Sequence, residues 1–151
     1  MACISDAMGL ATINPVAGSS LIGFGTPPDA QINFSIVYFH GTLDDTIPYD
    51  DRTSVGNGPY DTVISYDGYY YERKELLLAN WAKQMECEDT EENYPTFYDG
   101  QNDFQCWQRH CKNGKDILRC IGSYGHDYAL PGHSTVAAEI AYEFMKSHPR
   151  A

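Results

Sequence analysis

The sequence feature that most constrains the fold is a continuously apolar run, Ile36-Val37-Tyr38-Phe39. Its residues do not alternate between apolar and polar types, so the pattern predicts a strand that is covered on both faces. Strands of this kind lie inside parallel sheets that carry helices on either side. The run continues into His40-Gly41-Thr42-Leu43-Asp44, so the predicted strand presents an acid just beyond its carboxyl end.

Strand and helix patterns alternate along the rest of the chain. We expect the residues from Met1 to Met8 to be the last turns of a helix that Gly9 closes, and a short strand to follow over residues 10–17. A third strand is predicted over residues 116–121. The segments 50–71 and 88–113 are polar, so we expect a loop and a surface excursion there. This order predicts an α/β fold of parallel strands with flanking helices, in a single domain over residues 1–151.

Two segments carry a helical period. Residues 72–87 place Leu77, Trp81 and Met85 on one face. A second helix is predicted to begin near a cap at Ser134 or Thr135 and to stop at His148-Pro149. Its apolar stripe is expected to contain Val136, Ala137, Ile140, Ala141, Phe144 and Met145.

Charge and hydropathy exclude several classes of partner. The chain has 10 basic and 21 acidic residues, a net charge of −11, which repels nucleic acids and anionic membranes. No run reaches the roughly 20 apolar residues that span a bilayer, and the first residues lack the pattern of a signal peptide. Four of the five cysteines nevertheless fall close together, at positions 87, 106, 111 and 120, which favours disulfides made in an oxidising compartment. Three pairings of these four are possible.

An acid and a histidine follow two of the predicted strands. Asp44 follows the first strand, and His126 follows the strand over residues 116–121. Because open α/β sheets place their functional groups at the carboxyl ends of strands, we expect these side chains to form a site. Such a pair is two thirds of a hydrolytic triad. Asp45 competes for the acid role, and the alternative role of Asp44 is to cap the turn before Pro48.

The third member of a triad is missing from the sequence. A nucleophile on a strand-to-helix elbow has the pattern G-x-S-x-G, and no serine here has glycine two residues away on both sides. Ser19 and Ser20 are interpreted as loop residues, since no helix is predicted to begin there. Cys3 lacks the flanking glycines of an elbow. His133, just before the last helix, is interpreted as a solvated residue of the capping region.

The segment His40-Gly41-Thr42-Leu43-Asp44-Asp45-Thr46-Ile47-Pro48-Tyr49 resembles the acid loop of the secreted polyhydroxybutyrate depolymerase and feruloyl esterase group of α/β hydrolases. The resemblance runs through most of the chain. It also includes Met1-Ala2-Cys3, Asn14-Pro15-Val16-Ala17-Gly18-Ser19, Trp81 with Cys87, Cys111-Lys112-Asn113-Gly114-Lys115-Asp116-Ile117, and Gly125-His126.

The resemblance implies a partial α/β-hydrolase fold, namely the C-terminal portion, with the nucleophile elbow upstream of Met1. It assigns the acid to Asp44 and the base to His126, and it implies an extracellular serine esterase that acts on polymer or plant cell-wall esters without a cofactor. It favours a Cys87–Cys111 disulfide, which would leave Cys106 to pair with Cys120 and Cys3 free.

Two alternatives stay open on the sequence. A zinc site could use Cys106, Cys111 and Cys120 with His110, although the spacings lack a C-x2-C knuckle. The chain could also be a non-catalytic remnant or a binding module. That second reading would leave the strand over residues 11–17 as an exposed sheet edge.

Overall fold

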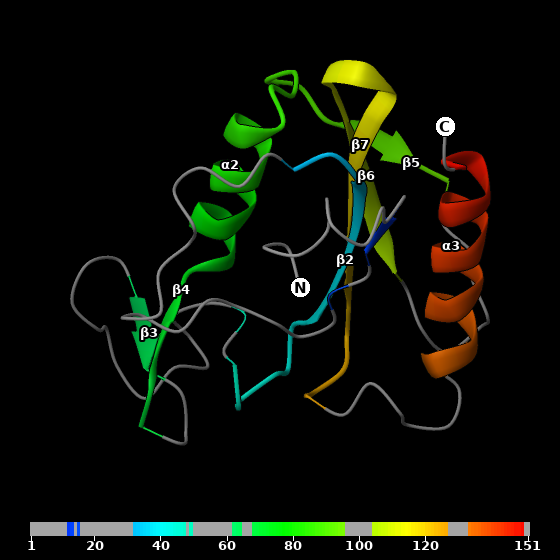
Figure 1. Cartoon of the computed structure of the whole chain (residues 1–151). Helices are drawn as coiled ribbons and strands as arrows, with labels where there is room; N and C mark the ends of the chain where they lie inside the picture. Colours follow the sequence, from blue (N-terminus) through cyan, green and yellow to red (C-terminus); the bar gives the residue numbers. More distant parts are fainter. Residues whose placement is uncertain are drawn as a thin grey trace.

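A computed structural model of the chain describes residues 12–13, 15, 32–47, 49, 62–64, 68–95, 104–126 and 133–149. Five strands form one sheet in the order β1-β2-β7-β6-β5. Strands β1 (Thr12–Ile13), β2 (Ser35–Gly41) and β7 (Lys115–Gly122) are parallel to one another. The helices α2 (Lys74–Gln84) and α3 (His133–Ser147) cover opposite faces of this sheet (Figure 1). The chain therefore has an α/β fold of three layers.

Strand β2 is the buried interior strand that the apolar run predicts. All seven of its residues are buried, and it pairs with β1 on one side and β7 on the other. Of the predicted strand over residues 10–17, the structure describes residues 12, 13 and 15, and Thr12–Ile13 is strand β1. The carbonyl of Pro15 still accepts a hydrogen bond from Phe39 N at 3.2 Å.

The outer half of the sheet differs from the prediction. The polar segment 88–113 contains β5 (Glu92–Tyr94) and β6 (Gln105–Cys111), and both pair antiparallel with their neighbours. The 3-10 turn Lys112–Gly114 then joins β6 to β7, with positive φ angles at Asn113 and Gly114. The sheet is therefore mixed and not purely parallel. In β6 the polar side chains of Gln108, Arg109 and His110 contact acidic residues, so this strand carries little hydrophobic pattern.

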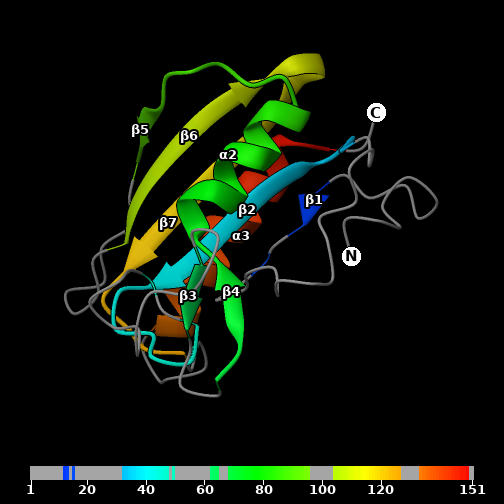
Figure 2. The same ribbon diagram turned by 90° about the vertical axis from the view of Figure 1, so that its left-hand side faces the viewer.

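The loop expected over residues 50–71 also contains strand. A small antiparallel pair is formed by β3 (Thr62–Ile64) and β4 (Tyr70–Glu72), and β4 leads directly into α2 (Figure 2). In the same view α2 lies across the face of the large sheet, and its first turn is at the end where β2 and β7 finish.

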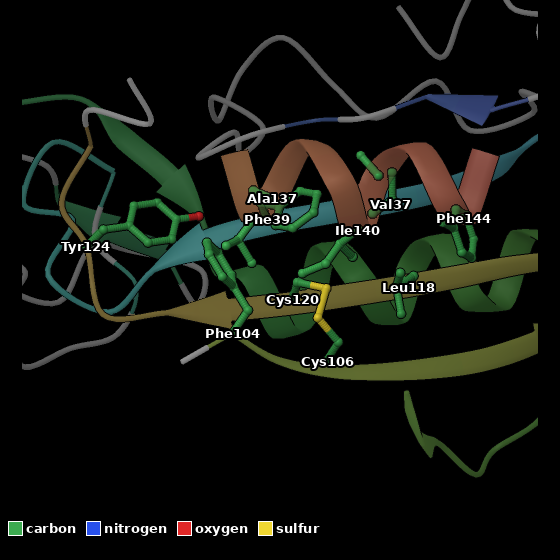
Figure 3. Close-up of a cluster of buried hydrophobic side chains, with 12 residues drawn as sticks. Val37, Phe39, Phe104, Cys106, Leu118, Cys120, Tyr124, Ala137, Ile140 and Phe144 are labelled. Carbon is green, nitrogen blue, oxygen red and sulfur yellow. A yellow bond between two sulfur atoms is a disulfide. The ribbon is translucent and has the colours of Figure 1, made fainter. Parts of the chain in front are cut away.

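Two apolar clusters join the layers. Between the sheet and α3, Val37, Phe39 and Leu118 pack against Ile140 and Phe144 (Figure 3). Between the sheet and α2, a second cluster contains Ile36, Tyr38, Leu77, Met85 and Ile117, with Trp81 packed against it.

The two predicted helices are present with small differences. The first is shorter than predicted, at Lys74–Gln84, and the second begins at His133, before the expected cap. The α3 stripe is buried from Val136 to Phe144, but Met145 is 40% exposed and lies outside it. Within the described residues no helix is long and apolar enough to cross a membrane.

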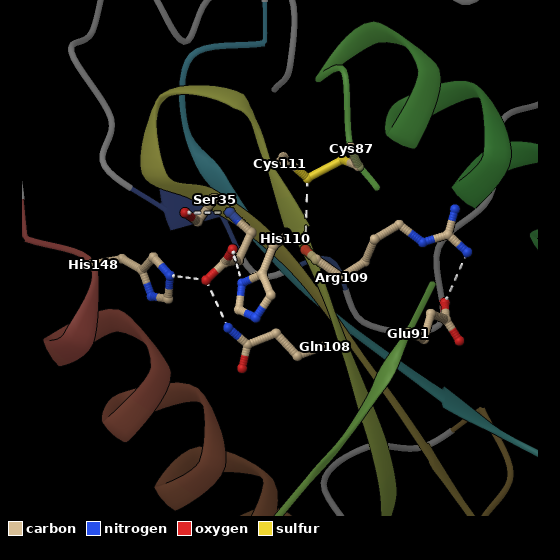
Figure 4. The surroundings of a disulfide bond; sticks show 9 residues. Ser35, Cys87, Glu91, Gln108, Arg109, His110, Cys111 and His148 are labelled. Atoms are coloured by element: carbon tan, nitrogen blue, oxygen red, sulfur yellow. Dashed lines mark hydrogen bonds and ion pairs between the residues drawn. A yellow bond between two sulfur atoms is a disulfide. The ribbon is translucent and has the colours of Figure 1, made fainter. Parts of the chain in front are cut away.

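The four clustered cysteines form two disulfides. Cys87 is bonded to Cys111, and Cys106 is bonded to Cys120, which are the pairings that the resemblance implies. The first bond ties the end of α2 to the end of β6 (Figure 4). The second joins residues that face each other across β6 and β7. Cys3 lies outside the described residues.

Candidate active site

The structure brings Asp44 and His126 into contact. Asp44 lies three residues beyond the end of β2, and His126 lies four residues beyond the end of β7. Because these strands are parallel neighbours, both loops leave the same edge of the sheet. Asp44 Oδ2 lies 3.1 Å from His126 Nδ1, within hydrogen-bonding distance. The pair predicted from the two strand ends is therefore a real juxtaposition.

The two loops are joined by their backbones. Thr42 N donates to Gly122 O at 2.8 Å, and Leu43 N donates to Tyr124 O at 3.0 Å. The strand ends must come very close for these bonds to form. A Cβ on Gly41 would lie 2.0 Å from the carbonyl oxygen of Tyr124, and one on Gly122 would lie 2.9 Å from the Phe104 and Tyr124 rings. Glycine at both strand ends therefore fixes the distance between the acid and the histidine.

The carboxylate of Asp44 divides its two oxygens between two tasks. Oδ1 accepts the backbone N–H groups of Thr46 at 3.0 Å and Ile47 at 2.9 Å, which holds the turn before Pro48. Oδ2 faces His126. The capping role and the role of an acid partner, which compete as interpretations of the sequence, are both realised in one side chain.

The environment of Asp44 keeps the carboxylate ionised. Its side chain is fully buried, and burial alone raises the pKa of a carboxyl group. Hydrogen bonds from His40, the Ile47 N–H and His126 act in the opposite direction and prevail, so the pKa of Asp44 lies below its usual value. An ionised Asp44 can only accept hydrogen bonds, so the proton in its contact with His126 belongs to His126 Nδ1.

The position of that proton determines what His126 can do. With Nδ1 protonated, the neutral imidazole carries its lone pair on Nε2. The side chain of His126 is 41% exposed, and Nε2 has no hydrogen-bond partner among the described residues. The contact with the buried Asp44 therefore leaves Nε2 of a neutral His126 as the nitrogen that can accept a proton.

A second histidine, His40, also contacts the carboxylate of Asp44, and the sequence did not predict this contact. His40 is buried in β2, and its Nε2 lies 2.9 Å from Ile47 O and 3.4 Å from Asp44 Oδ2. Its Nδ1 lies 2.5 Å from the hydroxyl of Tyr38. Burial raises the pKa of Tyr38, so this hydroxyl stays protonated and donates to Nδ1. His40 then carries its proton on Nε2 and presents it to the acid loop.

One signal in the sequence points to this arrangement. Tyr38 and His40 are two residues apart in a strand, so both side chains lie on one face of the sheet. That face is the one that α2 covers, since Tyr38 packs in the cluster beneath this helix. Two polar side chains on the buried face of a strand need hydrogen-bond partners. Tyr38 bonds to His40, and the acid loop provides the partners of His40 Nε2.

The remaining candidate residues fall in different places. Asp45 is exposed, whereas its neighbour Asp44 makes the contact with His126. Ser19 and Ser20 lie outside the described residues, as does the segment 127–132 after the histidine. His133 is the first residue of α3.

The zinc alternative loses its ligands to the disulfides. The sulfur atoms of Cys106, Cys111 and Cys120 are all bonded to other sulfur atoms. His110 instead donates to a carboxylate, because its Nδ1 lies 2.9 Å from Asp116 Oδ1. Within the described part of the chain, no group of three or more His, Cys, Asp or Glu side chains is arranged to hold a metal ion.

Comparison with known proteins gives no family for this chain, because neither a protein-family model nor a curated protein matches its sequence.

Proposed function

We propose that this chain supplies the acid and the base of a serine carboxylic ester hydrolase. The observation that carries the proposal is the contact between buried Asp44 and Nδ1 of His126, a side chain that is 41% exposed and whose Nε2 has no partner among the described residues. The parallel strands that present the two residues, with a helix layer on each face, are compatible with the C-terminal portion of an α/β-hydrolase fold.

The reaction follows from the position of the protons. His126 Nε2 removes the proton of a serine hydroxyl as the serine oxygen attacks the ester carbonyl, and Asp44 stabilises the imidazolium that forms. The imidazolium then protonates the leaving alcohol, which leaves an acyl-serine. In the second half, His126 takes a proton from water, and the attack of this water releases the acid and restores the serine.

The serine is not among the 151 residues in this proposal. No residue of the sequence has the G-x-S-x-G context, so the nucleophile and most of the oxyanion hole come from another segment. The substrate class rests on the resemblance of residues 40–49 to the polyhydroxybutyrate depolymerase and feruloyl esterase group. We propose esters of a polyester or of plant cell-wall feruloyl and acetyl groups, outside the cell, and the two disulfides support an oxidising environment.

The test restores the proposed nucleophile. The chain is produced with the coding sequence that precedes it, and ester hydrolysis and labelling by a fluorophosphonate serine probe are measured for the longer protein. We expect hydrolysis and labelling at a G-x-S-x-G serine, and no labelling of the 151-residue chain alone. Replacement of His126 by alanine should abolish turnover in the longer protein.

Two results would overturn the proposal. Strong labelling of the short chain would place a nucleophile inside it. A longer protein that hydrolyses esters equally well with His126→Ala would show that His126 is not the base. The matched control is His110→Ala, which removes a histidine bonded to a different aspartate.

A further inference from the structure

A pocket of about 390 Å³ lies beside the proposed acid, on the α2 face of the sheet. Its volume falls in the range of small-molecule sites. The wall nearest the acid contains Tyr49, whose ring makes an edge contact with His40 at a centroid distance of 5.7 Å. His40 in turn lies 3.4 Å from Asp44 Oδ2. One side chain therefore separates the pocket wall from the carboxylate of the dyad.

The other walls come from strands β6 and β7, from Glu91 just before β5, and from helix α2. Ile121 lies near the carboxyl end of β7, before the loop that carries His126. The first two turns of α2 form the opposite wall. The full lining is Tyr49, Lys74, Glu75, Leu78, Ala79, Glu91, Arg109, Arg119 and Ile121. At Ile121 the pocket reaches the end of β7 from which the loop of His126 leaves.

The lining is positively charged within an acidic protein. Three basic and two acidic side chains line the pocket, whereas the chain as a whole carries a net charge of −11. The excess comes from Arg109 and Arg119, which share the single carboxylate of Glu91. Burial raises the pKa of Glu91, but both guanidinium groups lower it and prevail, so this carboxylate is ionised. One positive charge therefore remains without a matching anion in the lining.

Both guanidinium groups also have N–H groups that are not hydrogen-bonded to any described residue. Arg119 donates to Glu91 through Nε and Nη2, and it stacks on Trp107 with its Cζ 4.1 Å from the ring centroid. Within the described part of the chain, Arg109 donates through Nη2 alone. The other N–H groups of these two side chains bond to none of the described residues. A planar guanidinium with free donors suits a carboxylate, which can accept two parallel hydrogen bonds.

The opposite wall is fixed and amphipathic. Lys74 is buried, donates to Tyr49 O at 2.7 Å, and lies 3.4 Å above the Tyr49 ring. It also pairs with Glu75, so its charge is neutralised and serves to hold Tyr49 in place. Tyr49, Leu78 and Ile121 offer apolar surface to the C–H groups of a sugar ring, and the two glutamates can accept from hydroxyl groups.

We propose that this pocket binds a uronate, a sugar ring that carries a carboxylate, in the alcohol part of the substrate. The assignment of the ring to the alcohol part rests on the proposed ester hydrolase function. It makes the substrate an ester of an acidic polysaccharide, with the uronate carboxylate on Arg109 and Arg119.

The test measures binding without any reaction. The 151-residue chain, labelled with ¹⁵N, is titrated with digalacturonate and with the matched neutral disaccharide galactobiose. We expect saturable shifts at the Arg119 Nε–H and Trp107 indole signals, with digalacturonate at least tenfold tighter than galactobiose. Equal affinity for the two sugars, or no saturable binding of digalacturonate, would overturn the proposal.

Two variants should change the affinity for digalacturonate in opposite directions. Arg119→Gln should weaken digalacturonate binding at least tenfold. Glu91→Gln should tighten it severalfold, because it removes the carboxylate that competes for both guanidinium groups. An affinity gain cannot arise from partial unfolding, so this variant keeps the test valid if Arg119→Gln folds poorly. Unchanged or weaker binding by Glu91→Gln would contradict the proposal.

The charge control is Lys112→Gln, which removes an exposed cation that pairs with Glu86 at the turn between β6 and β7. Its digalacturonate affinity should stay within twofold, and a loss equal to that of Arg119→Gln would mean non-specific charge attraction and sink the proposal. If the chain binds digalacturonate but the longer protein hydrolyses no ester, the uronate pocket stands and its role in an esterase is refuted. Hydrolysis without binding would refute the pocket alone.

Discussion

Two buried aspartates, at opposite ends of the sheet, each contact two histidines. Asp44 lies beyond the carboxyl end of β2 and contacts His40 and His126. Asp116 lies at the amino end of β7 and accepts from His110 at 2.9 Å and from His148 at 2.7 Å. The residue types are the same at both ends. The clusters differ in what the second ring nitrogens of their histidines face.

In the cluster around Asp116, the second ring nitrogen of each histidine faces an acceptor within the fold, and for His110 this is Glu92, with Nε2 3.8 Å from Oε2. Gln108 also donates to the Asp116 carboxylate, at 2.6 Å, and the Asp116 backbone N–H donates to Ser35 Oγ (Figure 4). His148 Nε2 faces the carboxylate while its Nδ1 faces Phe144 O at 2.8 Å. Both of its nitrogens lie beside acceptors, which favours the protonated imidazolium. This cluster fastens the end of α3 to the sheet.

The cluster around Asp44 differs in one nitrogen. His126 uses Nδ1 for the carboxylate and keeps Nε2 without a partner among the described residues, on a side chain that is 41% exposed. A buried Asp–His pair is thus a structural tie when the far nitrogen is occupied. It becomes a candidate for acid–base chemistry when that nitrogen is presented to the outside.

The largest expected effect separates the two aspartates by activity. In the longer protein that contains the proposed nucleophile, Asp44→Asn should lower kcat about 10⁴-fold, because the amide favours the wrong tautomer of the histidine. Asp116→Asn should leave kcat within a few-fold. Steady-state ester hydrolysis measures both, and Asp45→Asn is the exposed neighbouring control. A similar loss of kcat for Asp44→Asn and Asp116→Asn would erase the distinction between the clusters.

The next effect concerns the end of the molecule near Asp116. Replacement of Cys87 and Cys111 by alanine should lower the free energy of unfolding by about 3 kcal/mol, because the bond closes a loop of 24 residues. Urea denaturation measures this loss. The His126 side-chain NMR signals should not move, since the disulfide lies at the far end of β6. A shift of these signals would show that the two ends are coupled.

A smaller loss of stability is expected for Asp116→Asn. The substitution removes the charge that accepts from His148, His110 and Gln108, and hydrogen bonds to charged groups contribute about 1.5–3 kcal/mol. We expect a loss of about 2 kcal/mol in urea denaturation. Asp45→Asn, at an exposed position, should change stability by less than about 0.5 kcal/mol. Equal losses for the two variants would contradict the tie between α3 and the sheet.

The smallest effect is a pH dependence of this tie. The hydrogen bond to Asp116 raises the pKa of His148, and burial opposes this to a lesser extent. Burial raises the pKa of Asp116, but its bonds from His148 and His110 prevail and lower it. The raised pKa of His148 gives stability below about pH 6.5 that is lost as pH rises through its folded value. The lowered pKa of Asp116 gives stability above about pH 3.8 that is lost as pH falls through its folded value.

The stabilising window of the Asp116–His148 pair therefore lies between about pH 4 and pH 6.5. The difference in unfolding free energy between the native chain and His148→Gln should be larger at pH 5.5 than at pH 9. Urea denaturation at the two pH values measures it. A difference that is the same at both, or larger at pH 9, would refute a protonated His148.

The sequence predicts the parts of the fold that hydrophobic pattern determines. The continuous apolar run of β2 and the helical periods of α2 and α3 are visible in the sequence, and each element is present. Strand β6 was expected as part of a surface excursion, because Gln108, Arg109 and His110 look like surface residues. Their partners are Glu91 and Asp116, so the pairing that makes this segment a strand is visible only in three dimensions.

The same limit applies to the site. Asp44 and His126 follow strongly patterned strands, so their proximity can be predicted from topology. The contact of His40 with Asp44 depends on how the acid loop turns back over β2, which residue types do not specify. The pocket between Tyr49 and Arg119 joins five separate segments and has no local sequence signal.

The most direct test of the central claim is the position of the proton on His126. In ¹⁵N NMR spectra of the chain at a pH where this histidine is neutral, we predict that Nδ1 carries the hydrogen and Nε2 does not. Asp44→Asn should shift the proton towards Nε2, and Asp116→Asn should leave it in place. A native His126 with its proton on Nε2 would contradict the account, because that nitrogen could not then accept the proton of a nucleophile.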